Sequence, residues 1–279
     1  MYLLQRTPLS LANDIRGREI IGNALQLLAD SSAGLEFEPE PHRYTLHGRE
    51  IPSVSDIVTY YAPFNSEARA KKCAESKDPK SKYYGMTAEE ILAMWNDKRD
   101  RAAEAGTAVH AFAEACFLWM TGHENEIEAD FRDRITEDGL TAISEKEQAA
   151  ARWWSDLDWS RYIIVAKETR IVNPVLNYAG TFDLLLYDFD TDTFVIKDYK
   201  TNEDLFKWFK EYLRAPLNMI KSTDEGKYTL QQNLYRIQME NIGIPVSRME
   251  LIWLKEDTTY QEVRLREYEK LVRYAMRNN

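Results

Sequence analysis

Residues 178–202 read YAGTFDLLLYDFDTDTFVIKDYKTN, and this stretch decides the fold. Two apolar runs, residues 181–187 and 193–199, flank the polar residues 188–192, whose composition is typical of a turn. The pattern predicts a β-hairpin. Each predicted strand carries one aspartate, Asp183 or Asp198, at a position where an apolar residue is expected.

The two aspartates are predicted to lie opposite each other. If the turn is symmetric about Asp190 and Thr191, Asp183 pairs with Asp198, and directly paired residues share a face with Cβ atoms roughly 5 Å apart. Two carboxylates at this separation repel unless one is protonated or a cation lies between them. Because hard oxygen ligands suit magnesium and manganese, the pair predicts a divalent metal site.

Lys200 lies two residues beyond Asp198 and therefore on the same face of the strand. A lysine beside such a site can orient an attacking water and stabilise the charge that develops on a phosphoryl group. An isolated Asp-x-Lys is more often a solvated ion pair at a strand end. The sequence leaves this alternative open.

Two short motifs in this stretch, GTFD at 180–183 and DYKT at 198–201, resemble those of the PD-(D/E)XK nuclease superfamily. The resemblance is to the RecB-like and phage-type exonuclease branch, including mitochondrial genome maintenance exonuclease-like proteins, and covers about residues 40–265. It implies an α/β fold with a restriction-endonuclease-like core, in which a central mixed β-sheet is flanked by helices, with extra N-terminal helices. We expect residues 1–40 to form a helical extension and 41–279 a single nuclease domain.

A third motif lies in the predicted helix 88–120, where residues 106–114 read GTAVHAFAE. Helical spacing places His110 and Glu114 one turn apart on one face. Such a pair is usually found at the surface or the edge of a core. Gly-x-x-x-His-x-x-x-Glu resembles the first motif of the family, however, which implies that His110 is a metal ligand. The sequence lacks His-Glu-x-x-His, so a zinc-protease site has no support.

Glu168 is a further candidate, in the predicted strand 163–172. Alternation places it on one face with Ile164, Ala166 and Arg170. Pairing with Arg170 would account for an acid in this position. The resemblance implies instead that Glu168 completes the metal site or supports its ligands.

The fourth family motif, Gln-x-x-x-Tyr, matches Gln231 and Tyr235 in a helix that we expect to open near residue 228. The pair could hydrogen-bond a backbone phosphate or stack a base; a hydrogen bond to a neighbouring strand is the alternative. Between the hairpin and this helix, residues 203–214 predict an amphipathic helix. We expect its Lys207 and Lys210, together with Thr201, to lie along the path of the nucleic acid.

The resemblance implies metal-dependent hydrolysis of phosphodiester bonds. One or two Mg2+ or Mn2+ ions would be held by Asp183, Asp198, His110 and the backbone carbonyl of Tyr199, with Glu114 and Glu168 orienting ligands or holding a second ion and Lys200 positioning the water. The expected substrate is DNA with a free end or a single strand, in phage or bacterial DNA recombination, repair or degradation. A structure-specific or nicking endonuclease would use the same residues, and a non-catalytic nucleic-acid-binding protein is a further alternative.

The amino-acid composition limits which other classes of protein the chain could belong to. The formal net charge of −10 argues against a non-specific coat on nucleic acid, although not against a nuclease with one basic cleft. Cys73 and Cys116 are too few for a four-cysteine iron–sulfur cluster, so none is expected. No apolar run approaches the ~18 residues of a membrane span, and no signal-peptide core is seen. We expect a soluble protein of the cytoplasm of a bacterium or phage-infected cell, with no membrane partner.

Outside the motifs, the pattern predicts a helical N-terminus over residues 1–34 and a helix over 144–159, with Trp153 and Trp154 in the core. Residues 248–255 and 260–265 predict a closing hairpin, and 268–277 a final helix.

Overall fold

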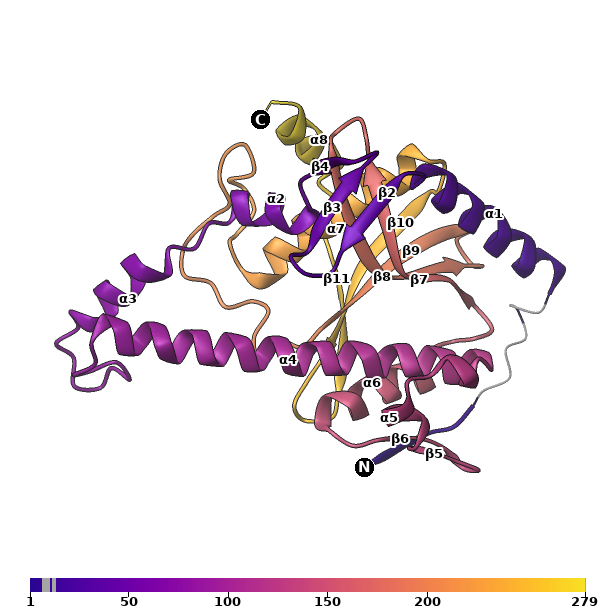
Figure 1. Cartoon of the computed structure of the whole chain (residues 1–279), viewed down its shortest axis with the longest axis horizontal. Helices are drawn as coiled ribbons and strands as arrows, with labels where there is room; N and C mark the ends of the chain where they lie inside the picture. The colour runs from indigo at the N-terminus through magenta and orange to yellow at the C-terminus, as the bar shows by residue number, and fades with distance from the viewer. Residues whose placement is uncertain (7–10, 12–13, 279) are drawn as a thin grey trace. The chain divides into compact units, whose positions relative to one another are not determined.

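The computed structural model describes residues 1–6, 11 and 14–278, and Figure 1 traces the chain. Its helices are α1 (Ile15–Ser31), α2 (Val54–Tyr61), α3 (Ser66–Ala74), α4 (Ala88–Thr121), the 3-10 helix η1 (Glu124–Glu126), α5 (Ala129–Arg132), α6 (Glu145–Asp156), α7 (Asp224–Asn241) and α8 (Glu269–Arg277). Its strands are β1 (Tyr2–Leu4), β2 (Leu35–Glu38), β3 (Arg43–Leu46), β4 (Arg49–Ile51), β5 (Ile135–Thr136), β6 (Gly139–Ala142), β7 (Tyr162–Asn173), β8 (Tyr178–Asp188), β9 (Thr193–Lys200), β10 (Val246–Leu254) and β11 (Tyr260–Arg264).

The chain forms two compact units. Met1–Ala62 and Phe112–Asn279 make up the first, and Pro63–Ala111 the second. This division differs from the expected boundary at residue 40, because β1 pairs with β6 and α1 packs on β7, which ties the N-terminal residues to the first unit. In the second unit, the Trp95 indole N–H donates to the Tyr83 hydroxyl at 3.0 Å, and the Trp95 ring also contacts Phe64.

The first unit is built on a five-stranded sheet in the order β11-β10-β9-β8-β7. The β9–β10 pair is parallel and the other neighbours are antiparallel, so the sheet is mixed. The β8–β9 hairpin has the predicted register: Asp188 pairs with Thr193 and Leu184 with Lys197. A pair of parallel strands requires a crossover, and α7 provides it between β9 and β10.

Helices cover both faces of this sheet. On one face, apolar side chains of α7, including Leu230 and Leu234, join Leu185 and Ile196 of the hairpin in one core cluster. On the other face, Trp153 of α6 contacts the Tyr199 ring at 5.8 Å between centroids. The protein is therefore a mixed α/β structure with a central mixed sheet flanked by helices, as the sequence predicts (Figure 1).

The predicted helix over residues 1–34 is only partly correct. Tyr2–Leu4 form a strand, because Leu4 is fully buried and pairs with Leu140 of β6. The helix begins at Ile15, where the Asp14 side chain accepts from the Arg16 backbone N–H. Residues 7–10 and 12–13 of the predicted helix lie outside the described part of the chain. The other predicted elements, α6 with its buried tryptophans, the β10–β11 hairpin and α8, are confirmed.

The predicted helix over residues 203–214 is wrong, since the segment folds as an irregular loop. Its backbone bonds across to a later segment: the Leu213 N–H donates to the Ile220 carbonyl at 3.0 Å, and Ser222 to Glu211 at 2.9 Å. Lys210 has φ 62°, in the left-handed region that a helix does not use. Tertiary pairing has therefore overridden an apolar spacing that suits a helix.

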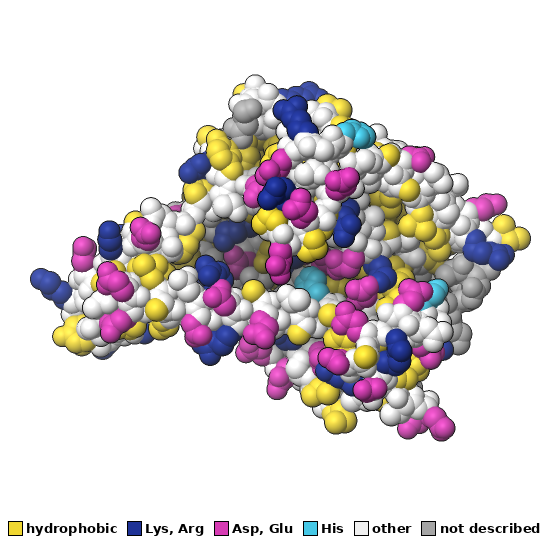
Figure 2. Space-filling model, viewed as in Figure 1, with side chains coloured by type: hydrophobic (Ala, Val, Ile, Leu, Met, Phe, Trp, Pro, Cys, Tyr) yellow, Lys and Arg dark blue, Asp and Glu magenta, His cyan; other side chains and the backbone are white. Residues whose placement is uncertain are grey.

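The surface seen in Figure 2 carries acidic and basic side chains interspersed with one another. This mixture agrees with a chain whose acidic excess is moderate, 46 Asp and Glu against 36 Lys and Arg. Within the described ranges of the chain, none of the helices combines the length and the apolar character needed to cross a bilayer.

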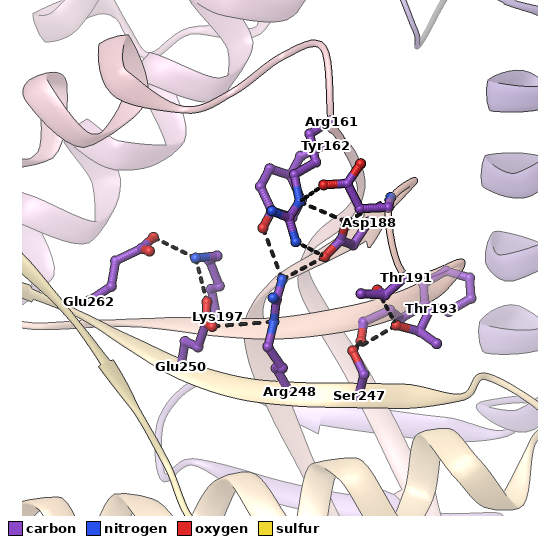
Figure 3. Close-up of polar contacts among 12 residues, drawn as sticks. Arg161, Tyr162, Asp188, Thr191, Thr193, Lys197, Ser247, Arg248, Glu250 and Glu262 are labelled. Carbon is purple, nitrogen blue, oxygen red and sulfur yellow. Dashed lines mark hydrogen bonds and ion pairs between the residues drawn. The ribbon is translucent and has the colours of Figure 1, made fainter.

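A row of charged side chains, of which Lys197 and Asp188 are buried, crosses the α6 face of the sheet (Figure 3). Arg248 donates to Asp188 at 2.7 Å and lies beside Glu250, and the Lys197 ammonium donates to Glu250 at 2.6 Å and also binds Glu262. Lys197 is only 2% exposed. Burial would raise the pKa of Glu262, but the Lys197 ammonium more than offsets this and lowers it. The ion pairs fix the relative positions of β8, β9, β10 and β11.

Replacing Lys197 with methionine should destabilise the protein by about 3–5 kcal/mol, the scale for removing one partner from a buried ion pair. Glu250 and Glu262 would then lose the buried ammonium that they share, and Arg248 would remain beside Glu250. Thermal and denaturant unfolding measure the loss. Lys270→Met on the exposed side of α8 is the matched control and should change stability by less than about 0.5 kcal/mol. Equal stabilities would show that the row contributes nothing.

Candidate active site

The two aspartates of the hairpin lie where strands β8 and β9 stop pairing. Leu184–Lys197 is the last paired position, and the register places Asp183 and Asp198 at the next one. Here the Asp183 carboxylate accepts the Tyr199 backbone N–H at 2.9 Å, in the place of a ladder hydrogen bond. Both acids are buried, Asp198 at 1% exposure. The predicted opposition of the two acids therefore agrees with the register of the hairpin.

Glu168 reaches the same side of the sheet because strand β7 contains an irregularity. Ile164 pairs with Leu186, but Ala166 pairs with Leu185, so the register shifts by one residue at this bulge. Ile164 and Ala166 therefore lie on opposite faces, which corrects the predicted single face. Beyond the shift, Glu168 lies across from Asp183, since its neighbours Lys167 and Thr169 pair with Leu184 and Phe182. Bulges often re-aim side chains near functional sites in this way.

Glu168 and Asp183 form a close pair of acids. A carboxylate oxygen of Glu168 lies within 4.8 Å of one of Asp183. Burial and the charges of Asp183, Glu114 and Asp198 raise the pKa of Glu168 to about 8. Glu168 is exposed to solvent, which screens part of this effect. Glu168 also has φ 41°, a conformation that costs a non-glycine residue free energy and that often marks a functional site.

Lys200 is the cation of this acidic cluster. Its ammonium forms an ion pair with Asp198 and lies 4.6 Å from the centroid of the Tyr228 ring. Burial would lower the pKa of Lys200, but the charges of Asp198 and Asp183 more than offset this and raise it. The side chains of Lys200 and Asp198 are 13% and 2% exposed, so the pair is not the solvated strand-end ion pair of the alternative interpretation.

Gly180 explains the first residue of the GTFD motif in physical terms. A Cβ at this position would lie 2.7 Å from Cε1 of Tyr235 and 3.0 Å from Cγ2 of Val54. Such contacts are too short for any side chain. The glycine therefore lets α7 and α2 approach the strand three residues before Asp183.

Helix α4 carries the first family motif across the boundary between the two units. Glu114 belongs to the first unit, where it forms an ion pair with Lys167 of β7. His110 belongs to the second unit, one helical turn before Glu114 in the same helix. Lys167 was not predicted as a residue of the site. Its position next to Glu168 in β7 was the available signal, because adjacent residues of a strand lie on opposite faces.

Gln231 and Tyr235 lie on α7, and the Gln231 side-chain amide is 3.4 Å from the Tyr235 hydroxyl. Tyr235 is 2% exposed and is packed against Gly180. Burial raises its pKa, and the nearby charges of Asp198 and Asp183 add to that rise. A ring buried in this way is unavailable to stack a base, which corrects that part of the prediction. Contact of the pair with a phosphate stays a prediction.

The remaining predicted residues follow Lys200 directly. Thr201 directly follows strand β9, and its carbonyl accepts from the Lys146 ammonium at 2.9 Å. Lys207 and Lys210 are exposed in the loop after it. The side chain of Asn202, which was not predicted, links this loop to α7 by bonding Asp224 at 2.8 Å and the Tyr228 hydroxyl at 2.9 Å.

The first unit thus brings three carboxylates and one ammonium to the end of the β8–β9 hairpin. Glu168, Asp183 and Asp198 supply an excess of hard oxygen donors that a divalent cation would neutralise. Burial and the same excess of negative charge together raise the pKa of Glu168, because each carboxylate disfavours ionisation of the next. The residues therefore fit magnesium or manganese.

Comparisons with known proteins give distant matches. No family model matches the chain, and no curated protein matches its sequence. Among solved structures, the chain is similar to a protein from Eubacterium rectale provisionally named an exonuclease, at 15% identity and a TM-score of 0.40, over 81% of this chain and 80% of that one. It is also similar to the protein SSO0001, at 14% identity and a TM-score of 0.30, over 94% and 85%. Both likenesses are too distant to assign a reaction to this chain.

Proposed function

We propose that this protein is a magnesium- or manganese-dependent DNA nuclease of the PD-(D/E)XK type that cleaves phosphodiester bonds from a DNA end. The observation that carries the proposal is the grouping of Glu168, Asp183 and Asp198 with the Lys200 ammonium at one end of a hairpin. A structural ion pair requires one acid for one cation, whereas this site has three. An excess of closely spaced carboxylates is expected where a metal binds.

The metal ligands in this proposal are Asp183, Asp198 and Glu168, with the backbone carbonyl of Tyr199. His110 is proposed as a further ligand, because α4 carries it one turn from Glu114, whose charge acts on Glu168. A bound divalent ion would supply Lewis-acid activation of water and charge neutralisation at the phosphate.

The remaining residues act by charge and position. Lys200 stays protonated and so contributes its positive charge beside the scissile phosphate, where negative charge grows in the transition state. Glu114 forms an ion pair with Lys167 and so offsets part of its charge, which weakens the influence of this lysine on Glu168. Gln231 is proposed to contact the DNA backbone together with the Tyr235 hydroxyl, and Thr201, Lys207 and Lys210 to line the path of the strand.

End-labelled linear DNA and covalently closed circular DNA of the same sequence test the reaction and its class. With Mg2+ or Mn2+, linear DNA should lose its label as mononucleotides or short products, while closed circles stay intact. Without metal, neither substrate should change. Cleavage of the closed circle would instead support an endonuclease that uses the same residues, and no cleavage of either substrate with either metal would overturn the enzymatic proposal.

The setting that we propose is phage or bacterial DNA recombination, repair or degradation, where DNA ends or single strands arise.

A further inference from the structure

The irregular loop of residues 203–221 exposes an unusual set of side chains (Figure 1, orange trace between β9 and α7). Phe206, Trp208, Phe209 and Tyr212 are 49%, 37%, 60% and 50% exposed. Large aromatic side chains bury much apolar area when they pack, so four exposed within seven residues indicate a surface that binds something.

Basic side chains alternate with these rings. Over the whole loop, four cations (Lys207, Lys210, Arg214 and Lys221) accompany three acids (Glu203, Asp204 and Glu211), a net charge of +1 in a chain of net charge −10. From Phe206 onwards, where the rings lie, Glu211 is the single acid. The Lys221 ammonium lies 4.6 Å from the Trp208 ring centroid, and the Lys207 ammonium 5.5 Å from that of Phe209. Two of the lysine ammonium groups of the loop therefore lie next to exposed aromatic rings.

The loop is held in place although its rings are exposed. Four apolar side chains anchor it in the main core: Leu205, Leu213, Leu217 and Ile220 are all at most 4% exposed. The Trp208 indole N–H donates to the Glu211 carbonyl at 2.7 Å, and its ring meets that of Tyr212 edge-on at 5.4 Å between centroids. Binding therefore would not have to order this segment, which lowers its entropic cost.

The loop also adjoins the acidic cluster. It begins three residues after Lys200, and the Phe206 ring contacts Trp253, which pairs with Lys200 in the β9–β10 ladder. The Trp253 indole N–H donates to the Asn202 carbonyl at 2.7 Å, which fixes the start of the loop against the sheet.

We infer that the 203–221 loop is a binding site for single-stranded nucleic acid, in which Trp208, Phe209 and Tyr212 stack unpaired bases and the neighbouring lysines pair with phosphates. Rings that alternate with cations match the alternation of base and phosphate along a single strand. Duplex DNA offers no unstacked bases, so the rings would add little to its binding. The inference deepens the proposed nuclease function, because it names single-stranded nucleic acid as what the site receives.

The test measures binding of a fluorescein-labelled oligothymidylate by anisotropy in EDTA, so that no cleavage occurs. Phe209→Ala and Tyr212→Ala should each weaken binding by about 10-fold, the scale of a lost base–aromatic stack. Binding of a duplex of equal length should change less than about twofold. Phe209→Tyr keeps a ring and should bind like the wild type. Tyr274→Ala is the matched control, since it removes a 58% exposed ring from α8.

An oligonucleotide with abasic sites separates stacking from charge. The wild type should bind this oligonucleotide weakly, because it offers no bases to stack at the abasic sites. Phe209→Ala should bind it with the same affinity as the wild type. Unchanged oligothymidylate affinity in the loop variants would overturn the inference, as would equal losses for duplex and single strand. Tight binding of a protein partner without binding of oligonucleotides would also overturn it.

A second measurement separates this inference from the proposed reaction. Hydrolysis of bis(p-nitrophenyl) phosphate with Mn2+ needs no base stacking, so the loop variants should keep the wild-type rate. If the protein hydrolyses this ester but the loop variants bind the oligonucleotide normally, the inference alone fails. If oligonucleotide binding depends on the rings but no phosphodiester is hydrolysed, the proposed reaction fails and the binding site stands.

Discussion

Lys200→Ala should lower kcat on DNA by roughly 10² or more while leaving DNA affinity within a few-fold. The ammonium is protonated and lies beside Asp198, so it cannot serve as a metal ligand, and its contribution is expected in the transition state. Single-turnover rates at saturating enzyme isolate this step from binding. Lys200→Met, which keeps more of the side-chain volume, should show the same loss.

The Lys200→Arg variant is the sharper comparison. A planar guanidinium does not reproduce a compact ammonium between Asp198 and the Tyr228 ring, so it should restore little activity. Melting temperatures of all three variants show whether each is folded. Wild-type turnover in a folded Lys200→Ala would mean that the pair is a structural one, and the proposed mechanism would lose its charge-stabilising group.

The double variant Asp183→Asn with Asp198→Asn should lose both activity and stabilisation by metal. In the wild type, Mn2+ should raise the melting temperature, because an ion that binds the native state stabilises it by mass action. Differential scanning fluorimetry across a manganese titration measures the effect. His110→Ala should weaken the response without abolishing it, since one proposed ligand is lost and the carboxylates remain.

The control for charge alone is Glu19→Gln with Glu40→Gln, two exposed acids of the same unit. It should retain the full manganese response. A normal response in the aspartate double variant would place the metal elsewhere.

The manganese response should also depend on pH. The pKa of Glu168 is raised to about 8, so in the metal-free protein this acid is largely protonated at pH 6.5 and largely ionised at pH 9. The metal needs the ionised form, and stabilisation by manganese should therefore increase as pH rises through this window. Without metal the sign reverses: the raised pKa of Glu168 contributes stability at low pH that is lost as pH rises towards 8. Glu168→Gln should flatten both dependences.

The hairpin could be predicted from sequence because its signals are local. Alternation in two runs and a turn-like composition between them fix the register, and the register alone places Asp183 opposite Asp198. The exposed rings of the 203–221 loop were assigned to a helix, because an apolar spacing near 3.6 does not reveal that Leu213 pairs with Ile220. That pairing depends on tertiary packing, because Leu213 and Ile220 are both buried in the main core.

Alternation alone could not place Glu168 opposite Asp183, for a different reason; only the family resemblance implied its place at the metal site. The alternation rule assigns each residue of a strand to a face by its position in the sequence. The bulge in β7 inserts one residue and so reverses the face of those that follow, and nothing in the amino-acid composition of the strand indicates it. The pairing of Lys167 with Glu114 depends on the packing of α4 on the sheet, which is likewise absent from local sequence.

The bulge between Ile164 and Ala166 selects one of two possible neighbours for the acidic site. If β7 had no bulge, the register of the Ile164–Leu186 pair would continue along the strand. Lys167 would then lie across from Asp183, and Glu168 would lie on the opposite face of the sheet. The strand would then neutralise its own aspartates with a built-in ammonium, and a divalent ion would have to compete with a tethered cation. One additional residue exchanges that base for an acid, so the irregularity in β7 determines whether the site repels cations or attracts them.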